Sequence, residues 1–202
     1  MNVYSIPLNF ELPLFNTKLS PIEFLKSQPA WATNVNTNRR LASHFQLNWK
    51  IDLSHKLKQF FFKHNQEVLL CEIFYRYPNI ISPIHSDEQQ SGDYSKMNWI
   101  LGGEDSEMHW YTINDKFYNK TALEPKNATP INSYSIIYLP AEVDLAYSEN
   151  VRGPALVQVG LPHNVRNGNQ ERWCVSIVFR DLGLGRRPTM VEANEIFKQY
   201  LI

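Results

Sequence analysis

The chain has 202 residues, of which 20 are acidic, 20 are basic and 43% are hydrophobic. This length fits one domain with a sizeable core, and the apolar content excludes disorder for most of the chain. The balanced charge gives no electrostatic footprint for nucleic acid or an anionic membrane, so neither is expected as a partner. No apolar run reaches the roughly 20 residues that span a bilayer, and the N-terminus lacks the basic segment of a signal peptide. We therefore expect a cytoplasmic protein, or one of the host cytoplasm if a virus encodes it.

Three stretches carry helix signals: residues 20–27, 52–65 and 189–202. The first begins with Ser20 and Glu23 and the last with Thr189 and Glu192, and both pairs have the spacing of a capping box. The middle stretch places leucines and phenylalanines at helical spacing.

The pattern between these helices is typical of β-structure. Seven short β-prone runs are separated by turn residues: 68–77, 83–87, 97–101, 108–113, 134–139, 155–162 and 172–180. Several such runs predict a sandwich or a barrel, so the fold class is expected to be mainly β with flanking helices. We predict a single domain over residues 1–202, with helical support in 1–67, the β core in 68–180 and a C-terminal helix in 181–202. The polar stretch 114–133 is expected to be a long loop.

A His-x-Asp pair lies in one of these runs. His85 and Asp87 are two residues apart in "PIHSD", and alternate residues of a strand point to the same face. An imidazole and a carboxylate on one face can bind a divalent metal, and two histidines with one carboxylate form the facial triad of non-haem Fe(II) oxygenases. The polar stretch 88–96 that follows is expected to be a loop at the mouth of this site.

The third ligand and an anion-binding group come from the segment "GLPHNVRNGNQERWCVSIVF". His163 ends one β-run, and Arg172 opens the next run nine residues later. A buried arginine there offers a planar fork for a carboxylate.

The series His85-x-Asp87, His163, Arg172 resembles the Fe(II)/2-oxoglutarate-dependent oxygenase superfamily, in particular its prolyl- and aspartyl-hydroxylase-like members. The resemblance covers about residues 68–180 and implies a double-stranded β-helix, a jelly roll related to the cupins. It implies that His85, Asp87 and His163 are the catalytic residues that hold Fe(II), and that Arg172 pairs with the C5 carboxylate of 2-oxoglutarate. Ascorbate could serve as a reductant.

The resemblance is incomplete around the cosubstrate. Some members carry a serine two residues after the arginine, where this chain has Cys174, and Ser176 is the next residue on that face. Asn98, Tyr111 and Tyr75 are further candidates for contacts with 2-oxoglutarate.

Other residues near the site have open roles. Arg152 and Arg166 are candidates for contact with an anionic substrate. Trp99 and Trp110 could line a substrate pocket, although core packing is the more common role of a strand tryptophan.

Three functions remain open on the sequence. The first is a 2-oxoglutarate-dependent dioxygenase that hydroxylates a peptide or protein side chain, or a free amino acid, with release of succinate and CO2. The second is a cupin-like metal protein, such as an isomerase, without 2-oxoglutarate turnover. The third is a non-enzymatic β-sandwich binding module. The sequence indicates neither the individual substrate nor the oligomeric state.

Overall fold

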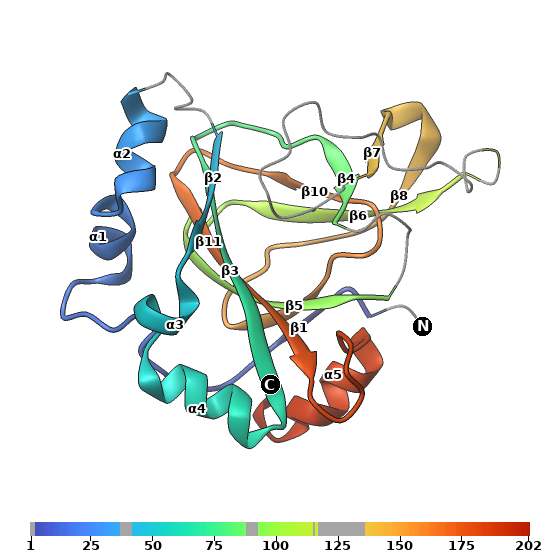
Figure 1. Ribbon diagram of the computed structural model, residues 1–202. Coiled ribbons are helices and arrows are strands. Elements are labelled where there is room, and N and C mark those ends of the chain that lie inside the picture. Colours follow the sequence, from blue (N-terminus) through green and yellow to red (C-terminus); the bar gives the residue numbers. More distant parts are fainter. Residues whose placement is uncertain (1–2, 37–41, 88–92, 115, 117–135) are drawn as a thin grey trace.

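The computed structural model describes residues 3–36, 42–87, 93–114, 116 and 136–202 (Figure 1). Its larger sheet has six strands in the order β1-β9-β5-β11-β3-β2, and every neighbouring pair is antiparallel. These strands are β1 (Ser5–Pro7), β9 (Ala155–Gln158), β5 (Ser95–Gly102), β11 (Arg172–Asp181), β3 (Gln66–Arg76) and β2 (Ala42–Leu47).

The smaller sheet has five antiparallel strands in the order β7-β4-β10-β6-β8. These strands are β7 (Ile136–Tyr138), β4 (Ile84–Ser86), β10 (His163–Arg166), β6 (Glu107–Ile113) and β8 (Val143–Glu149). From β3 to β6 and again from β8 to β11, successive strands belong to alternate sheets, which is the winding of a jelly roll. The predicted class, mainly β with a cupin-like jelly roll, is confirmed.

The helices lie around the larger sheet (Figure 1). Their bounds are α1 (Pro21–Lys26), α2 (Pro29–Asn36), α3 (Trp49–Asp52), α4 (His55–Lys63) and α5 (Met190–Phe197). Both predicted capping boxes are present, at Ser20 and at Thr189. The helix expected over 52–65 is interrupted at Leu53, and Ser54 accepts a hydrogen bond from Leu57 N at 3.1 Å to cap α4. No helix among the described residues is long and apolar enough to cross a membrane.

The main hydrophobic core lies between the larger sheet and these helices. Strand β11 contributes alternate residues, including Trp173 and Phe179, and helices α4 and α5 contribute Phe61 and Phe197. The residues between them on β11 face the smaller sheet, so this strand is buried on both sides. Its apolar face therefore fixes the sheet against the helices, and its other face is free to line a site between the sheets.

Two sequence expectations change. The segment 1–67 supplies strands β1 and β2 as well as helices, because β1 pairs with β9 and β2 with β3. Ser95 and Lys96, expected in a loop at the mouth of the site, are buried in β5. Residues 88–92 of that expected loop, and nearly all of the polar stretch 114–133, lie outside the described residues.

Candidate metal centre

Two neighbouring strands of the smaller sheet bring the histidines together. His85 lies in β4 and His163 begins β10, and the two residues are direct partners across this antiparallel pair. Their ring centroids are 4.5 Å apart. Asp87 follows β4 directly, and its backbone N–H donates to Val159 O at 3.0 Å, which ties the end of β4 to the chain that leaves the larger sheet.

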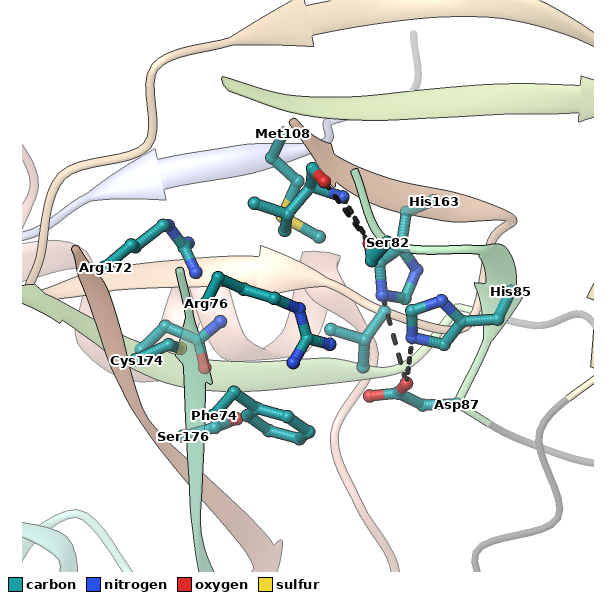
Figure 2. Close-up of a pocket in the computed structure, with 13 residues that line it drawn as sticks. Phe74, Arg76, Ser82, His85, Asp87, Met108, His163, Arg172, Cys174 and Ser176 are labelled. Carbon is teal, nitrogen blue, oxygen red and sulfur yellow. Dashed lines mark hydrogen bonds and ion pairs between the residues drawn. The ribbon is translucent and has the colours of Figure 1, made fainter. Parts of the chain in front are cut away.

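The three predicted ligands converge on one point (Figure 2). Asp87 Oδ1 lies 3.4 Å from His85 Nε2 and 3.9 Å from His163 Nε2. One potential ligand atom from each residue lies within 4.8 Å of the others, and no second such cluster occurs in the part of the chain that the structure describes.

The hydrogen bonds of the histidines select the form that can bind a metal. His85 Nδ1 lies 2.9 Å from Pro83 O, and His163 Nδ1 lies 2.8 Å from Leu161 O. A carbonyl oxygen only accepts, so each Nδ1 carries the proton, and in a neutral ring Nε2 is left with a lone pair. Backbone carbonyls orient metal-binding histidines in this way. Two imidazole lone pairs and a carboxylate oxygen therefore face one another, and this set of acceptors fits a divalent cation.

The charges of the site are set by burial and by Lys96. Burial, together with the neighbouring His85, lowers the pKa of His163 to about 4, so this ring is neutral at pH 7. Burial alone would raise the pKa of Asp87, but the Lys96 ammonium and the two histidines hold it well below its ordinary value. The site thus presents neutral His163 and an ionised carboxylate, the protonation states that metal binding requires.

A cavity of about 70 Å³ extends from these ligands between the two sheets, which is room for several water molecules. Arg172 and Arg76 both line it, and they are direct partners in the register of β11 and β3. Figure 2 shows Arg76 extending from its strand toward His85 and Asp87. Arg172 Nε donates to Ser106 Oγ at 3.2 Å and Arg76 Nη1 to Tyr75 O at 3.0 Å, and neither forms an ion pair with any described residue.

The other predicted cosubstrate contacts divide into two groups. Asn98 and Ser176 line the cavity, as does Cys174, and Asn98 Oδ1 is buried without a hydrogen-bond partner. Tyr111 and Tyr75 do not reach it. The Tyr111 hydroxyl donates to Asn164 Oδ1 at 3.1 Å within an apolar cluster of the smaller sheet, and Tyr75 packs against aromatic rings on the helix side of β3.

The remaining candidates lie outside the cavity lining. Arg166 is exposed, and Arg152 donates to Glu104 O at 2.7 Å on the surface. Trp99 and Trp110 are buried in the two larger cores, in agreement with the packing role.

Two charged residues near the ligands are not identified by the sequence analysis: Arg76 and Lys96. From the sequence, each of these two side chains is expected to be exposed to solvent, because charged residues in strands usually are. The only available signal is alternation, because Lys96 and Asn98 share a face of β5, as do Glu72, Phe74 and Arg76 on β3.

Comparisons with known proteins yield only distant structural likeness. No protein-family profile matches the chain, and no curated protein does. A solved 2OG-Fe(II) oxygenase family oxidoreductase from Burkholderia pseudomallei is 12% identical, with a TM-score of 0.33 over 90% of this chain and 99% of that one. Apo HygX from Streptomyces hygroscopicus is 11% identical, with a TM-score of 0.36 over 86% and 80%. Hazelnut vicilin, from Corylus avellana, is 9% identical at a TM-score of 0.34, and the alignment covers 68% of this chain but only 29% of the vicilin.

Proposed function

We propose that the protein is an Fe(II)- and 2-oxoglutarate-dependent dioxygenase that hydroxylates an amino acid, free or within a peptide or protein. The observation that carries the proposal is one cavity that holds both a His-Asp-His set and two guanidinium groups without an anionic partner among the described residues. A metal-chelating ligand with a carboxylate at its far end satisfies both features. 2-Oxoglutarate is such a ligand.

His85, Asp87 and His163 would hold Fe(II) through Nε2, a carboxylate oxygen and Nε2, and leave its other positions open. Arg172 would bind the C5 carboxylate, since a guanidinium pairs with a carboxylate through two parallel hydrogen bonds. Arg76 adds positive charge beside the same ligand, and the Asn98 amide lies on the cavity wall.

When bound, Fe(II) and 2-oxoglutarate supply the oxidising power: one atom of O2 enters succinate, which forms with CO2, and the other enters a substrate C–H bond as a hydroxyl group. The chain contributes orientation and exclusion of water. Arg172 and Ser106 fix the far end of the cavity, and Val159, Met108 and Val165 give it apolar walls.

The test is anaerobic titration of the protein with Fe(II) and 2-oxoglutarate, followed by the metal-to-ligand charge-transfer band in the green region of the spectrum. We expect a band in the wild type and none in His85→Ala/Asp87→Ala. Arg172→Leu removes charge-assisted hydrogen bonds worth about 1.5–3 kcal/mol, so it should lower the affinity for 2-oxoglutarate about 10- to 150-fold.

Arg180→Leu is the matched control. This arginine lies on the same strand, but it is exposed and pairs with Glu67, so its loss should leave the titration unchanged. A wild type that binds metal but develops no band would reject 2-oxoglutarate as the cosubstrate and favour a cupin-like metal protein. If the wild type develops the band, succinate release across a panel of amino acids and peptides would identify the substrate.

A further inference from the structure

Lys96 is a buried cation between two carboxylates beside the metal ligands. It lies on β5 with 5% of its surface exposed, on the face that looks toward the smaller sheet. Its Nζ is 2.6 Å from Asp87 Oδ2 and 2.7 Å from Glu72 Oε2. Both distances are those of charge-assisted hydrogen bonds.

The two oxygens of Asp87 therefore face different partners. Oδ1 faces His85 Nε2 and His163 Nε2, whereas Oδ2 is in contact with the ammonium of Lys96. We infer that Lys96 is a positioning residue that restricts Asp87 to binding the metal through Oδ1 alone. This inference rests on the metal site of the proposed function.

The restriction follows from the cost of an unpaired buried charge. If Asp87 turned to present both oxygens to a metal, Lys96 would lose one of its two anionic partners inside the protein, which is strongly unfavourable for a buried charge. Glu72 holds the ammonium from the other side, and His44 Nε2 lies 3.4 Å from Glu72 Oε1. The ammonium of Lys96 is thus held by Glu72, a residue of the larger sheet, and it contacts Asp87 at the end of a strand of the smaller sheet.

The consequence is an open coordination position. A carboxylate that binds through both oxygens occupies two positions on a metal, and one that binds through a single oxygen occupies one. Single-oxygen binding by Asp87 leaves room for a chelating cosubstrate together with O2.

The test uses Mn(II) alone, without a cosubstrate, and counts its exchangeable water molecules by water-proton relaxation. Lys96→Met frees Asp87 Oδ2 but also leaves the buried Glu72 carboxylate without its ammonium partner. The decisive variant is therefore Lys96→Met/Glu72→Gln, which removes both charges. We expect Mn(II) in this variant to hold one exchangeable water fewer than in the wild type. Glu72→Gln alone leaves the contact between Lys96 and Asp87 and should keep the wild-type number.

Lys26→Met is the control for loss of a lysine, because Lys26 pairs with Glu171 on the surface. An unchanged water count in both Lys96 variants, with Mn(II) bound, would overturn the role of Lys96 and leave the metal site intact. A wild type that fails to bind Mn(II) would overturn the metal site itself. Absence of the charge-transfer band, with the expected water counts, would reject only the cosubstrate.

Discussion

The position of Arg172 depends on a glycine. Gly103 has a φ of +61°, and a Cβ added to it would lie 2.7 Å from Arg172 Cβ. Gly103→Ala should therefore displace the arginine and lower the affinity for the proposed cosubstrate, 2-oxoglutarate, about 10-fold, a loss of about 1.4 kcal/mol. Gly185→Ala is the control, because Gly185 has a φ of +68° and open space around its Cβ position. The charge-transfer titration compares the two, and equal affinities would contradict the prediction.

Among individual residues, the sequence points to the candidate ligands but not to the charged residue beside them. His85 and Asp87 stand out because strand alternation is a local property, and the resemblance to a known superfamily adds His163 and Arg172. Lys96 cannot be found in this way, because the role proposed for it depends on Glu72 and Asp87. These residues approach it through the pairing of β3 and β5 with β11 and through the end of β4.

At the scale of elements, α5 shows how far local signals reach. Thr189 Oγ1 accepts from Glu192 N at 3.2 Å, and the Glu192 carboxylate accepts from Thr189 N at 2.8 Å. Thr189→Ala should lower the free energy of unfolding by about 1 kcal/mol, because it leaves an N-terminal N–H of the helix unsatisfied. Thr189→Ser keeps the hydroxyl and should stay near the wild type in urea unfolding. Equal losses in both variants would show that the methyl group, not the cap, is what matters.

The strands that the sequence analysis missed are held mainly by partners distant in sequence. Strand β1 has three residues and exists through pairing with β9, and β8 pairs with β6 although most of its residues are exposed. Short strands of this kind carry little hydrophobic alternation, so their formation is decided by the neighbouring strand.

At the scale of the whole molecule, the charged pair between the sheets links stability to pH. Burial would raise the pKa of Glu72, but Lys96 and His44 lower it to about 2 from an ordinary value of 4.5. As the pH falls, Glu72 is therefore protonated in the unfolded chain before it is protonated in the folded one. The folding stability that its charge contributes is present above about pH 4.5 and is lost as the pH falls toward 2. That loss corresponds to about 3 kcal/mol.

Glu72→Gln should therefore be less stable than the wild type near pH 6, and the difference should shrink near pH 3. Urea unfolding at both pH values measures it. Glu67→Gln is the control, because among the described residues Glu67 forms an ion pair only with Arg180, at the surface. A difference that stays constant with pH would mean that Glu72 acts through packing and not through its charge.

The sequence by itself determined the mainly β class and the capped helices, since each depends on residues close together in the chain. It also supplied the candidate ligands, through a local His-x-Asp pair and the family resemblance that joins this pair to His163 and Arg172. Only the tertiary structure decided that His85 and His163, far apart in sequence, are direct partners across two strands. It also decided that Arg76 lines the same cavity as Arg172, and that Tyr111 lies outside this cavity. It also placed Lys96 between the two sheets. The physical reason is that strand register sets which side chains face each other, and register is fixed by pairing between distant segments.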